Sequence, residues 1–273
     1  MTDRVKSLLD RTFDKEQAKF RRDIDWKPLL DTFIAERIDD ETRARMGLEA
    51  MLAAERPAFM DGERLHFLRT VRQIPDLHSD AEMDARRAAG TAFGEKGVVF
   101  NLTADFGTTI RDGLDARLAE LTARLARARA GQDDEGVSFL TNAILSVKAV
   151  LGLVDRYLQA LTTPPSPLNS HPSPPNSQPP PANPQLLSAV HTGAKTFPEA
   201  LQVLRVLHYA LWCEGEYHCG LGRIDQYLYP YYDADIRAGR LTDDAALEWL
   251  EEFFIACNRD SDLYIGVQQG DNG

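Results

Sequence analysis

The chain has few cysteines, no excess of basic residues and no export signal, and each absence excludes a class of protein. Three cysteines in 273 residues form neither a CxxC pair nor an even-numbered set, which excludes a disulfide scaffold. A net charge of -11 argues against binding to nucleic-acid phosphates or to anionic lipid. The first residues, MTDRVKSLLDRTFDKEQ, lack the apolar core of a secretory signal, and no apolar run predicts a membrane span. We therefore expect a cytoplasmic protein.

Common catalytic and metal-binding motifs are also missing. The sequence has no glycine-rich phosphate loop, no G-x-S-x-G elbow and no H-E-x-x-H pair. His208 and Cys213 lie within one predicted helix, and five residues turn a helix so that their side chains point about 140° apart. Because of this divergence they cannot share a zinc ion. His218 and Cys219 are adjacent in the chain and do not aim at one point, as a nucleophile and its base must. The sequence predicts no metal site.

Apolar spacing predicts a mainly helical chain. Residues 39–57 have acidic residues before apolar ones at helical spacing, and residues 111–130 carry leucines on one face. Residues 136–161 are apolar on more sides and predict a buried helix, antiparallel to the one before it. Two short segments, 64–74 and 97–103, contain β-branched and aromatic residues and predict strands.

Composition changes sharply at TTPPSPLNSHPSPPNSQPPPANPQ, which holds ten of the fifteen prolines. Proline donates no backbone hydrogen bond, so this stretch predicts a disordered linker or insertion over residues 162–187. It divides a helical part, residues 1–161, from a helical continuation, residues 188–273.

Helical order is predicted to return at Thr196, which forms a capping box with Glu199. A stripe of leucines follows on the core-facing side: Leu201, Leu204, Leu207 and Leu211. Thr242 is expected to cap the last helix. That helix has a predicted apolar face made of Ala246, Leu247, Leu250, Phe253, Phe254 and Cys257.

Between these helices lies LGRIDQYLYPYYDADIRAGRLT, residues 221–242. Its tyrosines can bury their rings while each hydroxyl finds a polar partner. Arg223 and Asp225 can pair or cap the turn into the following helix. The stretch therefore predicts a rigid corner of polar and aromatic side chains, without indicating its chemistry.

The same stretch resembles a family signature. LGRIDQYLYP is similar to the Leu-Gly-Arg-(Phe/Ile/Met)-Asp-Gln-Tyr-(Leu/Met)-Tyr-Pro motif of the glycyl radical enzymes, the superfamily of pyruvate formate-lyase. KTFPEALQVLRVLHY resembles the helix before that motif, and NLTADFGTTIRDGLDARLAEL resembles the segment before the barrel of that family. Together the similarities cover most of residues 40–273 outside the proline-rich stretch.

The resemblance implies an α/β fold. This is a ten-stranded barrel made of two five-stranded parallel halves and wrapped in helices, of which this chain would supply an incomplete, mainly helical N-terminal segment. It also implies anaerobic radical chemistry: a separate S-adenosylmethionine-dependent activating enzyme makes a glycyl radical, a cysteine thiyl radical follows, and the thiyl takes hydrogen from a small polar substrate. The full-length enzyme is expected to be a homodimer. No segment here resembles the family's cysteine loop or glycine loop, so the chain is interpreted as a fragment with no catalytic residue or bound cofactor of its own.

Substrate contacts are carried over by position. Asn101 falls where dehydratase-type members have a histidine, and Tyr217 and His218 fall where they have a His-Ser pair. The identities differ, so specificity for a diol or for glycerol does not follow. These three residues either contact the substrate as polar groups or satisfy buried backbone.

The resemblance leaves several functions open. The leading interpretation is a glycyl radical lyase or dehydratase, and formate C-acetyltransferase is the alternative reaction. A class other than enzymes is also left open. The protein would then be a non-catalytic truncated product, or an interaction fragment that docks onto a second chain.

We expect the proline-rich stretch to be dispensable for folding. Replacing Pro164–Pro184 with a short Gly/Ser linker should change the free energy of unfolding by less than about 2 kcal/mol, because the stretch offers no core residues. Urea denaturation of the two proteins measures the difference. Loss of folding in the shortened protein would show that the stretch is structural.

Overall fold

The computed structural model describes residues 1–91, 102–162, 183–216 and 219–261. These residues contain ten α-helices, one 3₁₀ helix and no β-strand. In chain order the elements are α1 (Asp3–Phe13), η1 (Glu16–Phe20), α2 (Lys27–Ala35), α3 (Asp40–Ala54), α4 (Asp80–Ala88), α5 (Phe106–Ala130), α6 (Asp134–Thr162), α7 (Pro184–Thr192), α8 (Phe197–Glu214), α9 (Ile224–Arg237) and α10 (Asp243–Ser261). The helical character is confirmed, whereas pieces of barrel wall are absent from the described ranges.

Local signals at the helix ends are confirmed. The carboxylate of Asp39 accepts a hydrogen bond from the Thr42 amide at 3.0 Å at the start of α3. Thr196 and Glu199 form both halves of the predicted capping box at the start of α8. Thr242 accepts from an amide in the first turn of α10 at 3.2 Å. Each bond satisfies an amide that has no partner inside its helix, so these boundaries follow from short-range chemistry.

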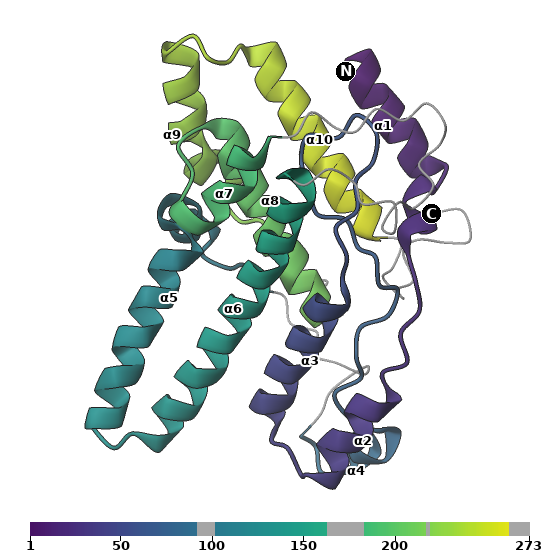
Figure 1. Cartoon of the computed structure of the whole chain (residues 1–273), viewed down its shortest axis with the longest axis vertical. Coiled ribbons are helices and arrows are strands. Elements are labelled where there is room, and N and C mark those ends of the chain that lie inside the picture. Colours follow the sequence, from purple (N-terminus) through teal and green to yellow (C-terminus); the bar gives the residue numbers. More distant parts are fainter. Residues whose placement is uncertain (92–101, 163–182, 217–218, 262–273) are drawn as a thin grey trace.

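Helices α5 and α6 form the predicted antiparallel pair (Figure 1). The inner face of α6 also packs against α3 and α7. Among the described helices, α6 is the one whose length and composition would allow it to cross a membrane, which the sequence reading missed. A core helix meets the same criterion, and its buried residues Leu153, Val154 and Tyr157 belong to the main hydrophobic core.

Helix α8 lies at the centre of the core. It contacts α3, α5, α7, α9 and α10, so it is buried on several sides rather than along one stripe. Leu201 and Leu204 are fully buried as predicted, but Leu207 and Leu211 are only partly buried. A helix that is surrounded in this way carries apolar residues on most of its faces.

The predicted apolar face of α10 is partly wrong. Ala246 and Phe253 are buried, but Leu247 and Phe254 are 52% and 53% exposed. The buried side of α10 instead includes Glu252, whose carboxylate binds Arg4 of α1 at 2.7 Å. Helices α1 and α10 lie side by side (Figure 1), joined by these charged contacts and by an apolar cluster of Val5, Leu8 and Ile255. A search for apolar spacing cannot detect the charged contacts.

Most of the predicted linker, residues 163–182, lies outside the described residues. Its last part belongs to α7, where Pro184 occupies the first turn and Leu186 and Leu187 are buried. Proline is favoured in a first turn because its missing amide hydrogen has no partner there. The replacement of Pro164–Pro184 would thus remove the first residue of α7.

A close backbone crossing joins α5 to the end of α7. Gly113 interrupts α5 with a φ of 79°, and a Cβ atom placed on it would lie 2.2 Å from the His191 carbonyl oxygen. Gly193 has a φ of 86°, and its Cβ would lie 2.1 Å from the Arg111 carbonyl oxygen. Glycine is required at both positions because the obstacles are backbone atoms and the backbone is left-handed.

The strand predicted for residues 64–74 is wrong. This part of the chain is extended and largely buried, but it makes no ladder; its β-pairing is an isolated parallel bridge between Arg22 and Val71. Of the other predicted strand, residues 97–101 lie outside the described residues, and Leu102 forms an isolated parallel bridge with Cys219.

Side chains replace the missing ladder. The Gln202 amide accepts from the His66 amide hydrogen at 2.8 Å and donates to the His66 carbonyl at 3.3 Å. The Tyr157 hydroxyl accepts from the Leu68 amide at 3.1 Å. Because buried backbone groups must be paired, the extended segment depends on these distant side chains.

Side chains also pair with the backbone nearer the two ends of the extended segment. Glu252 accepts from the Leu65 amide at 2.9 Å, and Glu55 accepts from the Thr70 amide at 2.7 Å. Arg205 donates to the Phe67 carbonyl at 2.6 Å. Phe67 itself has a φ of 89°, a conformation that a bulky residue adopts only when its surroundings enforce it.

Removing one of these partners should be costly. We expect Tyr157→Phe to lower the free energy of unfolding by about 1–3 kcal/mol, because the Leu68 amide is then buried without a partner. Tyr229→Phe is the matched control; Tyr229 is 57% exposed, so its change should stay within about 0.5 kcal/mol. Urea denaturation measures both, and equal effects would contradict the role assigned to the Tyr157 hydroxyl.

Candidate functional site

The three predicted substrate contacts, Asn101, Tyr217 and His218, lie outside the described residues. Their neighbours in the sequence are described, and they meet. Leu102 and Cys219 form the isolated parallel bridge, and the Gly220 amide donates to the Leu102 carbonyl at 2.8 Å. The two segments that carry the predicted contacts are therefore joined by backbone, although 116 residues lie between Leu102 and Cys219 in the sequence.

Two glycines allow this approach, Gly222 of the signature and Gly220 directly before it. Gly222 has a φ of 62°, and a Cβ placed on it would lie 2.7 Å from the Thr103 methyl carbon. A Cβ on Gly220 would lie 3.0 Å from the Thr103 hydroxyl oxygen. The Gly-Leu-Gly run is thus explained by contact with Thr103, since any side chain at Gly222 would collide with it.

Tyr227 fixes the other side of the corner. Its hydroxyl donates to the Leu221 carbonyl at 2.8 Å, and burial raises the pKa of that hydroxyl. Its Cβ packs on α5, where a Cβ at Gly107 would lie 2.9 Å away. Tyr227 therefore holds the turn before α9 against the start of α5.

The predicted aromatic corner is confirmed in part. The Tyr232 hydroxyl donates to Asp243 at 2.7 Å, and Arg223 pairs with Asp225 at 2.6 Å on the surface. Tyr229, which was expected to pack, is mostly exposed. Because the hydroxyls of Tyr227 and Tyr232 bind main-chain and side-chain groups of the same corner, their role in the described structure is to position it.

The three cysteines do not resemble reactive thiols. Cys213 is fully buried in α8, and burial raises its pKa. Burial likewise raises the pKa of Cys257 to about 12 and that of Cys219 above its ordinary value. Since the thiolate is the nucleophile, these surroundings suppress reactivity.

Sequence reasoning missed a group of buried ion pairs behind the corner. Arg205 binds Asp260 at 2.6 Å, and Arg259 binds Glu63 at 2.6 Å; all four side chains are buried. Burial, followed by repulsion from Arg205, lowers the pKa of His208 to about 4, so its ring is neutral near pH 7. The one signal in the sequence was a charged residue inside the apolar run VLRVL, because a charge in a core helix requires a partner.

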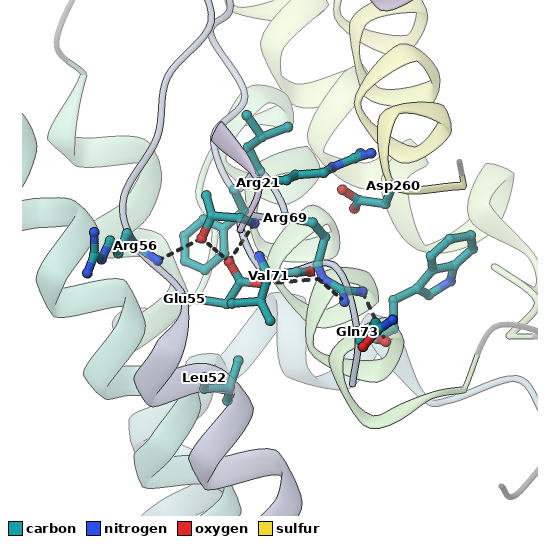
Figure 2. Close-up of polar contacts among 12 residues, drawn as sticks. Arg21, Leu52, Glu55, Arg56, Arg69, Val71, Gln73 and Asp260 are labelled. Carbon is teal, nitrogen blue, oxygen red and sulfur yellow. Dashed lines mark hydrogen bonds and ion pairs between the residues drawn. The ribbon is translucent and has the colours of Figure 1, made fainter. Parts of the chain in front are cut away.

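A third buried pair joins Glu55 and Arg69 (Figure 2). The Glu55 carboxylate accepts from Arg69 at 3.3 Å and from the amides of Thr70 and Val71. Burial raises the pKa of Glu55, and Arg69 and Thr70 oppose this shift. Arg69 also donates to the Trp212 carbonyl at 3.3 Å, which ties the extended segment to the end of α8.

Comparison with known proteins identifies relatives of this region. Residues 188–264 match the family model described as pyruvate formate lyase-like. A stretch of 49 residues is 45% identical to the isethionate sulfite-lyases of Nitratidesulfovibrio vulgaris and Bilophila wadsworthia. That stretch covers 18% of this chain and 6% of each relative.

The fold has solved counterparts. The glycerol-bound form of the B12-independent glycerol dehydratase from Clostridium butyricum superposes with a TM-score of 0.67 at 18% identity. Hydroxyproline dehydratase from Clostridioides difficile, with trans-4-hydroxy-L-proline bound, gives 0.68 at 16% identity. Each match covers 95% of this chain and 40% of the solved chain.

The shared fold and the matched residues confirm the resemblance to the glycyl radical enzymes. Within that superfamily the matched family is the pyruvate formate lyase-like one. The chain spans about 40% of the length of the solved relatives.

The contact between Gly222 and Thr103 can be tested by substitution. We expect Gly222→Ala to destabilise the protein by at least about 1 kcal/mol more than Gly239→Ala, because both glycines have positive φ but nothing lies within 4 Å of a Cβ at Gly239. Hydrogen exchange of the Gly220 amide should accelerate only in Gly222→Ala. Adding Thr103→Ser, which removes the obstructing methyl group, should restore part of the loss; no recovery would contradict this contact.

Proposed function

We propose that this chain is part of a glycyl radical lyase or dehydratase that acts on a small polar substrate by thiyl-radical hydrogen abstraction. The supporting observation is the joined corner, in which the signature residues hold Leu102 and Cys219 together. The relatives support the same class. Glycerol and trans-4-hydroxy-L-proline, bound in two of the solved relatives, are small hydroxylated molecules.

The radical groups themselves have no fitting residue among the described ones. Cys213 is enclosed by α8 and its neighbours, and the pKa values of Cys219 and Cys257 are raised by burial. These three thiols therefore take no part in the proposed chemistry. The proposal places the cysteine and the glycine radical in another part of the enzyme, with a radical S-adenosylmethionine activating enzyme as the partner that installs the radical, and with a homodimer as the assembly.

The residues of this chain would bind and position the substrate. Asn101, Tyr217 and His218 are the proposed polar contacts. Asn101 and His218 are adjacent in sequence to the bridge residues Leu102 and Cys219, and Tyr217 lies two positions before Cys219. A site that hydrogen-bonds a hydroxyl group discriminates strongly against molecules that lack it. The backbone bridge and the Tyr227 bond would set the spacing between these contacts.

Formate C-acetyltransferase remains the alternative reaction. The matching family model is described as pyruvate formate lyase-like. This description covers the family as a whole and does not favour one reaction over the other. A non-catalytic role as an interaction fragment is the alternative of a different class. To separate the two reactions, the activated longer enzyme is incubated either with pyruvate and coenzyme A or with a hydroxylated substrate such as glycerol. Analysis of the products shows which of the two substrates is converted.

Electron paramagnetic resonance tests the proposal. Residues 1–273, incubated anaerobically with an activating enzyme, S-adenosylmethionine and reductant, should give no glycyl radical, because no segment resembles the radical loop. A longer polypeptide that contains this chain together with the family's cysteine and glycine loops should give a glycine-centred doublet and should be cleaved in air.

Both outcomes are decisive. A doublet from residues 1–273 alone would show that the radical glycine lies within them. A silent longer protein with both loops intact would reject the enzyme proposal and favour the interaction fragment. Circular dichroism of each sample serves as the control for folding.

A further inference from the structure

A cavity of about 220 Å³ lies between four helices, next to the signature corner. Its wall is formed by Leu48 of α3, Phe106 of α5, Val147 and Val150 of α6, and Ala210 of α8. Ala104 and Asp105, which closely follow the Leu102 bridge, also line it. Apolar cavities between helices are common sites for small ligands, and a cavity with apolar walls gains free energy from an apolar occupant.

The charge of the wall has one sign. Among the described residues, Asp105 and Glu214 are the charged side chains that line the cavity, and none of the described lining residues is basic. The carboxylate of Asp105 is engaged, since it accepts from the Thr108 amide at 3.1 Å and from the Thr108 hydroxyl at 2.6 Å. Glu214 has no hydrogen-bond or ionic partner within the described part of the chain. It is exposed to solvent, while the surrounding protein still desolvates its carboxylate in part.

Further negative charge surrounds Glu214. It is the last residue of α8, where the carbonyl ends of the helix face outward. Desolvation, followed by repulsion from Glu216, raises the pKa of Glu214. A cation at this position would relieve both effects, whereas a second anion would add to the repulsion.

We propose that this cavity binds small hydrophobic molecules that carry one ammonium group, with the apolar part among α3, α5, α6 and α8 and the ammonium at Glu214. The inference does not depend on the proposed function. An occupant would contact Ala104–Phe106 and would therefore act next to the Leu102–Cys219 bridge, as an effector or as an accessory ligand.

The probes are 2-phenylethylamine, which is a cation at pH 7, and the neutral 2-phenylethanol, which has the same size. Binding is followed by calorimetry and by chemical-shift changes at the methyl groups of Val147, Val150 and Leu207. We expect the amine to bind about tenfold more tightly than the alcohol, as a charge-assisted hydrogen bond provides. Equal affinities, or no shifts at these methyl groups, would overturn the proposal.

Three variants locate the contacts. Glu214→Gln should remove the preference for the amine and leave binding of the alcohol unchanged, and it should fold normally because Glu214 is exposed. Ala210→Phe should fill the cavity and abolish binding of both probes. Glu251→Gln, which removes a carboxylate of α10 outside the cavity wall, should change neither affinity.

The outcomes of these variants remain informative if Ala210→Phe fails to fold. In that case Glu214→Gln decides: a preference for the amine that survives this change shows that Glu214 is not the partner, and the proposal is wrong. A loss of preference in Glu251→Gln as large as in Glu214→Gln would show that only overall charge matters, which would also reject it.

Discussion

The structure depends on one constraint: an extended segment runs through the core without a neighbouring strand. Its amides and carbonyls are paired by side chains of Glu55, Tyr157, Gln202, Arg205 and Glu252. These residues lie at the end of α3 and within α6, α8 and α10, so a single segment fixes the positions of four helices. Because buried polar groups that share partners act together, the loss of one is expected to weaken the others.

This constraint explains which parts of the fold could be predicted. Helix starts such as Thr196 and Thr242 follow from residues three positions away, and they were predicted correctly. The extended segment was mistaken for a strand because its partners are distant; Gln202 lies 136 residues from His66. The apolar face of α10 was misassigned for the same reason, since Glu252 is buried there to accept a hydrogen bond from the Leu65 amide of that segment.

The candidate site shows the same division. The signature gave the superfamily because its residues are contiguous, and the structure adds a reason for them, as Gly222 clears Thr103 and Tyr227 anchors the turn. The resemblance implied that the segments of Asn101 and of Tyr217 serve one substrate, but the backbone bridge between Leu102 and Cys219 could not be predicted, because no local pattern connects the two segments. The cavity was also missed, since its wall is assembled from residues of four helices and of the segment before α5, which are far apart in the sequence.

The backbone crossing of Gly113 and Gly193 has a mechanical consequence. Two main chains in direct contact cannot slide past each other as side-chain surfaces can, and the Ala194 amide adds a 2.8 Å bond to the Ile110 carbonyl. The end of α7 and the first turns of α5 are therefore expected to move together. A displacement of α7, which follows the proline-rich stretch in the chain, would then also displace Phe106 at the start of α5, four residues after Leu102.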